Sequence, residues 1–202
     1  MMEAAVHAFL LALGLILPLG VQNVFIFNQG ASQPSLRKAL PAVITAGVCD
    51  TLLIFLAVGG VSLLMLRWSW LTDILYGAGC LFLLYMAWSI WRSGQSQAGA
   101  PSPLRASRQV AFAASVSLLN PHAILDTVGV IGTSSLQYEG GDRWVFTLTA
   151  ALVSWCWFAG LAAAGRGVGR IDPAGGISRN LNRVSALVIF GLAIYMAVTL
   201  LR

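Results

Sequence analysis

The chain has 202 residues, of which 58% are hydrophobic and only 9% are charged, whereas a soluble domain carries about 25% charged residues. Its mean hydropathy is +0.81, and several apolar runs reach the roughly 20 residues that cross a bilayer as a helix. The net charge of +5 does not indicate nucleic-acid binding, because the basic residues lie in short connections between apolar runs rather than in one patch. Composition therefore predicts an integral membrane protein.

Six membrane-spanning helices are expected, each long enough to cross the hydrocarbon core. They cover residues 4–27, 39–66, 71–91, 109–133, 144–165 and 181–201. The second is longer than a membrane requires, so we expect a tilt or a break near Gly59 and Gly60. A stretch at 92–108 rich in Ser, Gly, Gln and Pro is typical of a linker, and it divides the chain into two three-helix halves, 1–91 and 109–202.

The first and fourth spans are interrupted by a Pro followed by polar residues. The first break is Pro18-Leu19-Gly20-Val21-Gln22-Asn23, and the second is Asn120-Pro121-His122 followed by Asp126. Lipid offers no partner for the freed backbone groups, so such breaks occur where they line a cavity, and paired breaks in two halves indicate a transport site. Because each half crosses the membrane an odd number of times, the second half enters the membrane from the side opposite to the first. The predicted fold is all-α, with six transmembrane helices in two inverted three-helix repeats and broken first and fourth helices.

The distribution of basic residues predicts the orientation of the chain. Connections one, three and five hold nine of the twelve Lys and Arg: Arg37, Lys38, Arg92, Arg105, Arg108, Arg166, Arg170, Arg179 and Arg183. By the positive-inside rule this side is cytoplasmic. The linker at 92–108 is then cytoplasmic, and both termini face the other side.

Two of the seven acidic residues, Asp50 and Asp126, lie within spans. A carboxylate near the bilayer centre costs roughly 2.5–3.5 kcal/mol on insertion scales, and it usually faces a partner or a substrate path. Within the expected spans, Lys and Arg are absent apart from Arg183 at the edge of the sixth, so none is placed to neutralise either residue. Each is expected to be a protonated structural residue or to bind a mobile cation, and we predict both to be substrate- or proton-binding residues.

His122 precedes Asp126 by four positions, so the two side chains share one face of a continuous helix. One interpretation is a proton relay at bilayer depth. The other is a neutral His that satisfies carbonyls freed by Pro121, and the sequence leaves both open. His7, the other histidine, lies at the surface end of the first span, so no metal site is expected. The cysteines form no close pair in the sequence, and no cofactor is expected.

Amide side chains near the breaks supply further candidate ligands: Gln22, Asn23, Asn28, Gln29 and Asn120. Some are expected to satisfy the broken backbone, and others to bind a substrate. The half-helices that begin after Pro18 and Pro121 present free N–H groups that suit a carboxylate, while Asp50 or Asp126 would suit a cation. Thr51 and Trp155 occupy equivalent places in the second and fifth spans and are secondary candidates, since an aromatic face can hold a cation.

Three of these motifs resemble those of the LysE-type amino-acid exporter family. The family's first-helix signature, Pro-Leu-Gly-Pro-Gln-Asn leading into Asn-Gln-Gly, is similar to residues 18–23 and 28–30. Its second-span aspartate matches Asp50, and its Leu-Asn-Pro-His followed by an aspartate matches residues 119–122 and Asp126. Val21 stands where the family often has a second Pro. The motifs occur in the expected order and cover nearly the whole chain.

The resemblance implies a transporter, not an enzyme, that exports an amino acid from the cytoplasm across the bacterial inner membrane. The substrate is commonly Lys or Arg, and export is driven by the proton gradient. Moving a cation outward against an inside-negative potential costs about 2.3 kcal/mol per 100 mV. Exchange of the cation for a proton removes this electrical cost. The expected partners are the amino acid, protons and the lipid bilayer, and a homodimer is left open.

Two other classes of protein remain open on sequence alone. Carboxylates with Asn and Gln oxygens can hold a hard cation, so an inorganic cation carrier of the same superfamily is the first alternative. A membrane enzyme or scaffold is the second, and it would leave the carboxylates within the spans without a purpose. Basic amino acids should raise the melting temperature of an exporter, whereas divalent ions should raise that of a cation carrier.

Overall fold

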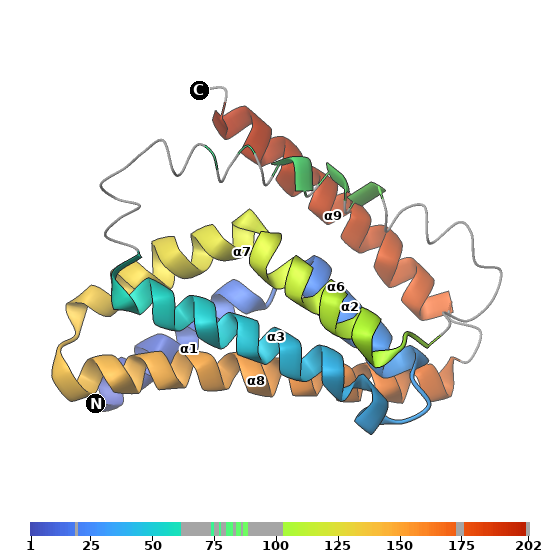
Figure 1. Ribbon diagram of the computed structural model, residues 1–202, viewed down its shortest axis with the longest axis horizontal. Helices are drawn as coiled ribbons and strands as arrows, with labels where there is room; N and C mark the ends of the chain where they lie inside the picture. Colours follow the sequence, from blue (N-terminus) through green and yellow to red (C-terminus); the bar gives the residue numbers. More distant parts are fainter. Residues whose placement is uncertain are drawn as a thin grey trace.

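The computed structural model describes residues 1–18, 20–61, 74, 77, 80–82, 84, 85, 87, 88, 103–172 and 176–200, and among them every regular element is helical (Figure 1). The expected third span at 71–91 and the linker at 92–108 lie largely outside these residues. Of the sixth expected span, 181–201, all but the last residue lies within α9 (Gly176–Leu200).

The first expected span is broken where the sequence predicts it. It consists of α1 (Met2–Ile16) and α2 (Val21–Ser32), which meet at a bend of 80°. Gly20 precedes α2 in an extended conformation, with φ −76° and ψ 176°. The bend follows from Pro18, whose ring cannot continue the hydrogen-bond ladder of a helix.

The second span is α3 (Leu36–Leu56), which continues into a π-helical segment, η1 (Ala57–Val61). Gly60 has φ 121° and is not helical. Because this region of φ is almost closed to residues with a Cβ, the glycine allows the helix to turn there. The break expected near Gly59 and Gly60 is confirmed.

The fourth span is also broken. It runs through α6 (Ala106–Leu119), α7 (Pro121–Leu125), the π-helical η2 (Asp126–Gly132) and the short 3-10 helix η3 (Ser135–Gln137). The bend between Ala106–Leu119 and Ala123–Gln137 is 61°. Asn120 is extended, as a residue before proline tends to be. π-helical segments such as η1 and η2 often occur at functional sites.

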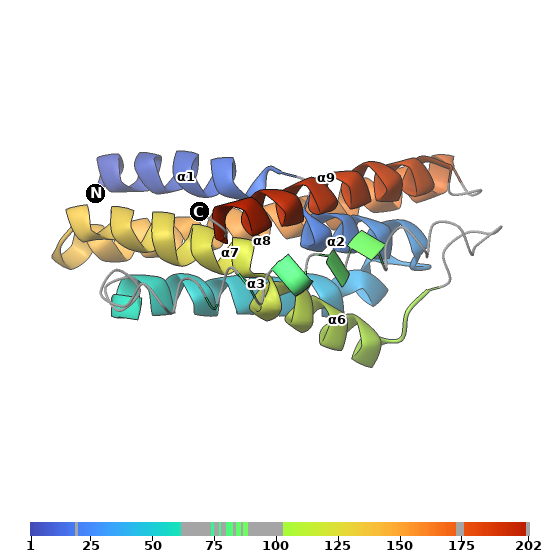
Figure 2. The same cartoon turned by 90° about the horizontal axis from the view of Figure 1, so that it is seen from above.

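The long helix α8 (Gly140–Ile171) packs along α1, α2 and α3 (Figures 1 and 2). Small residues on one face of α1 meet Phe146, Ala150 and Ala151 of α8. Glycines bring α8 against α2. A Cβ added at Gly165 would lie 2.0 Å from the carbonyl oxygen of Phe27, and one at Gly30 would lie 2.1 Å from that of Ala162.

The two broken spans run in opposite directions. The ring Nδ1 of His7, near the start of α1, lies 2.8 Å from the hydroxyl of Tyr138, just after η3. At the other end, Gln33 at the close of α2 donates to the carbonyl of Leu104, just before α6, over 2.8 Å. The start of each broken span therefore lies beside the end of the other.

Two described helices are long and apolar enough to cross a membrane by themselves, α3 with most of η1 (Leu36–Gly60) and α8. Counting each bent pair as one span raises the number to four among the described residues. Large apolar side chains such as Leu52, Leu148 and Leu152 point outward, as expected of helices in contact with lipid. The described residues form an all-helical fold and carry the long apolar helices of a multi-pass membrane protein; the division into six spans and inverted repeats stays a prediction.

Candidate functional site

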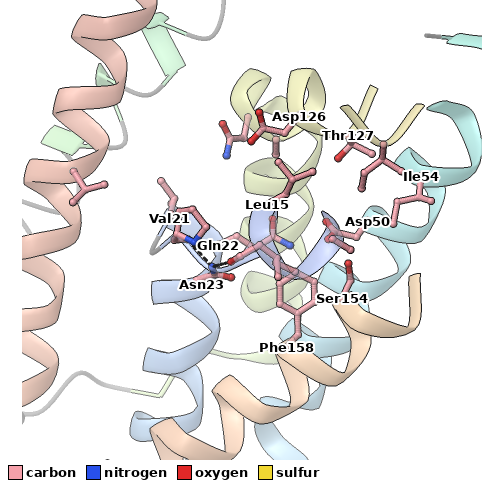
Figure 3. Close-up of a pocket in the computed structure, with 18 residues that line it drawn as sticks. Leu15, Val21, Gln22, Asn23, Asp50, Ile54, Asp126, Thr127, Ser154 and Phe158 are labelled. Atoms are coloured by element: carbon pink, nitrogen blue, oxygen red, sulfur yellow. Dashed lines mark hydrogen bonds between the residues drawn. The ribbon is translucent and has the colours of Figure 1, made fainter. Parts of the chain in front are cut away.

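The helix breaks surround a pocket of about 270 Å³ (Figure 3). Seven residues predicted from the sequence line it, and they come from three different spans: Pro18, Gly20, Gln22, Asn23, Asp50, Asn120 and Asp126. The pocket lies near the lower end of the range of small-molecule sites, which begins at about 300 Å³. Side chains that lie far apart in the chain thus meet where the first and fourth spans are broken.

Asn23 holds the two sides of the first break together. Its Nδ2 donates to the carbonyls of Ile16 and Pro18 over 2.6 and 2.8 Å. Its Oδ1 accepts a hydrogen bond from the indole Nε1 of Trp157 over 3.3 Å. Among the amides of the site, Asn23 thus satisfies the backbone carbonyls that the break frees, as expected for some of them.

Gln22 and Asn120 offer unused hydrogen-bonding atoms to the pocket. The Nε2 of Gln22 and the Oδ1 of Asn120 are buried and have no hydrogen-bond partner among the described residues. Gln22 as a whole is 9% exposed. An unpaired buried polar atom is costly unless a ligand or water satisfies it. The two atoms differ in kind, since one is a donor and the other an acceptor.

Asp50 lies on α3 at the edge of the pocket, and the side chains of Ser154 and Gln22 lie beside its carboxylate (Figure 3). Asp126 begins η2 and lines the same pocket. None of the described residues that line the pocket is Lys, Arg or His. The two carboxylates that the sequence places in separate halves therefore share one cavity whose described lining holds no basic side chain.

Four of the candidates predicted from the sequence do not line the pocket: Thr51, Trp155, Gln29 and Asn28. The Oγ1 of Thr51 donates to the carbonyl of Gly47 over 2.7 Å and accepts from the Nε1 of Trp155 over 3.0 Å, so this pair joins α3 to α8. The Oε1 of Gln29 accepts from Gln33 over 3.2 Å. Asn28 is also absent from the lining. The predictions for Pro121 and His122 concern side chains outside the described residues.

The pocket also contains residues that the sequence did not single out as ligands. Ser154 and Phe158 lie one helical turn apart on α8, and Thr127 follows Asp126 on η2. A Ser in an apolar span is a weak signal, because its hydroxyl can bond its own helix backbone. Its place beside Asp50 appears only once α8 is packed against α3.

Two arginines of α8 bind backbone carbonyls at opposite ends of the bundle. Arg143 donates to the carbonyl of Val58 in η1. Arg166 donates to the carbonyls of Gln33 and Pro34, at the end of α2, over 2.9 and 2.7 Å. Each guanidinium therefore caps a helix end whose carbonyls have no partner within the helix.

No group of three His, Cys, Asp or Glu side chains that could hold a metal ion occurs among the residues that the structure describes. The described cysteines, Cys49, Cys80 and Cys156, are all free. What the site presents is hydrogen-bonding and carboxylate chemistry in a cavity between broken, apolar helices. These features define the class as a membrane carrier.

Comparison with known proteins agrees with this class. The family model described as LysE type translocator matches residues 13–200, and the chain belongs to this family. It is 52% identical over 98% of its length to "Putative amino-acid transporter YisU" of Bacillus subtilis (strain 168), of which it covers 91%.

Relatives named as arginine exporters are more distant. The chain is 31% identical to the arginine exporter protein ArgO of Serratia proteamaculans (strain 568), over 98% of this chain and 97% of that protein. It is 30% identical to ArgO of Pectobacterium carotovorum subsp. carotovorum (strain PC1), over 93% of each. No solved structure matches the chain. The protein is an amino-acid exporter of the membrane and not an enzyme.

Proposed function

We propose that this carrier exports basic amino acids, Lys or Arg, in exchange for protons, with Asp50 and Asp126 as the groups that bind the cation or the proton. One observation carries the proposal: the two carboxylates come from different spans, Asp50 from α3 and Asp126 from η2, and both line the same pocket. A carboxylate at such a depth marks a substrate or ion path.

The unused amide atoms fit the other end of an amino acid. The α-carboxylate needs donors, which the Nε2 of Gln22 and the N-terminal N–H groups of α2 supply. The α-ammonium needs an acceptor, which the Oδ1 of Asn120 supplies. A zwitterion would satisfy both atoms at once, and its side-chain cation would then lie against Asp50 or Asp126.

The exchange has an electrical reason. When a carboxylate binds either the substrate cation or a proton, one positive charge leaves for each one that enters, so the complete cycle moves no net charge against the inside-negative potential. Without the exchange, export of one cation would cost about 2.3 kcal/mol per 100 mV.

The charge pattern supports an orientation in the bacterial inner membrane. The connection before Arg37 and Lys38 lies beside Leu104 and Arg166, because Gln33 bonds Leu104 and Arg166 bonds Gln33. Basic residues of the first, third and fifth connections thus gather at one end of the bundle. We assign this end to the cytoplasm, which puts the N-terminus, bonded to Asp142 at 2.8 Å, on the other side. The opposed directions of the broken spans support the inverted repeats.

Transport by the purified protein in liposomes tests the proposal. Vesicles loaded with radiolabelled arginine or lysine should release it when a proton gradient is imposed from the opposite side, and Asp50→Asn and Asp126→Asn should each reduce this release at least tenfold. Wild-type rates in both variants would refute the roles of the carboxylates. Stabilisation by divalent ions, with none by basic amino acids, would instead favour the cation carrier.

A further inference from the structure

Ser154 lies on α8 at the pocket and is buried, with 4% of its surface exposed. Figure 3 shows its hydroxyl directed toward Asp50 from the opposite helix. Of the described polar side chains that line the pocket, Ser154 and Gln22 lie beside this carboxylate. We propose that Ser154 is a positioning residue that sets the pH at which Asp50 exchanges its proton for the substrate cation. This inference rests on the role proposed for Asp50.

The chemistry of a hydroxyl suits both states of the carboxyl group. Ser154 has one O–H to donate and two lone pairs to accept, whereas the Nε2 of Gln22 can only donate. When Asp50 is ionised, Ser154 donates to it. When a proton from water bonds to a carboxylate oxygen, the new O–H can donate to Ser154, which keeps its own proton. The Asp50 carboxyl therefore has a partner in each step, and no bond of Ser154 itself is broken.

The two states are not stabilised equally. A hydrogen bond to an ionised acceptor is roughly twice as strong as one between neutral groups, so the hydroxyl favours the ionised carboxylate. Among the described side chains, the other titratable groups beside Asp50 are acids: Asp126 of η2, across the pocket, and the thiol of Cys49 on α3. A hydrogen bond from Ser154 favours the ionised form and keeps the carboxylate available to a cation.

A pair of variants of equal shape isolates the hydroxyl. Ser154→Thr keeps the O–H, and Ser154→Val replaces it with a methyl group of the same size. We expect the pH of half-maximal arginine or lysine exchange in proteoliposomes to rise by about one unit in Ser154→Val. The rise follows because Asp50 then holds its proton at higher pH. Ser154→Thr should stay within a few tenths of the wild-type midpoint.

Equal midpoints in the Thr and Val variants would overturn the inference, as would a fall in Ser154→Val. If Val lowers the melting temperature so far that transport is lost, Ser154→Ala takes its place. The midpoint is then read in detergent from the stabilisation by arginine as a function of pH. Asp50→Asn distinguishes the role of Asp50 in transport from the role of Ser154: if this variant retains proton-driven exchange, the proposed function fails. If it abolishes exchange while Ser154→Val keeps the wild-type midpoint, only the role of Ser154 fails.

Discussion

Trp157 fixes the orientation of Asn23. The indole Nε1 of Trp157 can only donate, so the amide oxygen of Asn23 must face it and the amide nitrogen must face the carbonyls of Ile16 and Pro18. A residue of α8 thus determines how the break between α1 and α2 is closed. The bend at Pro18 is therefore held in place by the hydrogen bonds of Asn23.

Asn23→Asp should destabilise the protein strongly, because a carboxylate would direct oxygen atoms at the two carbonyls that Nδ2 now satisfies. Each buried acceptor left without a donor costs about 1–3 kcal/mol. Trp157→Phe, which leaves Nδ2 in place and removes one long hydrogen bond, should cost about 1 kcal/mol or less apart from packing. Melting temperatures in detergent give the comparison. Equal losses in the two variants would contradict this account of Asn23.

Gly165→Ala should weaken the packing of α8 on α2, since the new Cβ would lie 2.0 Å from the carbonyl oxygen of Phe27. Forcing extra volume into a packed contact costs about 1–3 kcal/mol. Gly167→Ala is the matched control two residues away, because no atom lies within 4 Å of its added Cβ and Ala favours helix. Thermal unfolding should rank Gly165→Ala below the wild type and Gly167→Ala at or above it. The reverse order would show that the close approach is not required.

Gly60→Ala should be more harmful than Gly59→Ala. Gly60 has φ 121°, which a residue with a Cβ adopts only at a cost of about 1–3 kcal/mol, and Gly59 has no such conformation. Neither added Cβ would meet another atom within 4 Å, so the pair separates backbone strain from crowding. The midpoint of unfolding in a detergent titration series measures the difference. Similar midpoints would mean that η1 can relax into regular helix without loss.

Arg166→Gln should loosen the connection between α2 and α3, because two charge-assisted hydrogen bonds to Gln33 and Pro34 are lost. Hydrogen bonds to a charged group contribute about 1.5–3 kcal/mol. Arg170→Gln, one turn further on an exposed part of α8, is the control and should change little. Hydrogen–deuterium exchange at residues 30–38 should speed up in Arg166→Gln alone. Unchanged exchange there would remove Arg166 from this role.

The sequence predicts the breaks well because their cause is local. Pro18 and Pro121 end helices by covalent geometry, and Gly60 permits a conformation that other residues avoid. The composition of the spans predicts membrane helices for an equally simple reason, the length of an apolar run. Asp50 and Asp126 stand out because a carboxylate in an apolar run is rare.

The contacts between spans could not be predicted in the same way. That Asp50 and Asp126 share one pocket depends on how α3 and η2 are packed, which no spacing within either span encodes. The π-helical form of η1 and η2 has no clear sequence signal. The sequence presents Arg166 only as one of the charges that orient the chain and indicates no role for Arg143, whereas both bind the backbone of other helices. Such roles arise from tertiary packing.

The continuity of α8 limits how the pocket can open. Arg143 and Arg166 are 23 positions apart, so they lie about 34 Å apart along an unbroken helix, and Ser154 lies near the midpoint between them. An unbroken helix that is bound near both ends and lines the pocket near its middle links the two ends of the bundle. A tilt of α8 at the pocket would therefore disturb the contacts of Arg143 and Arg166 together.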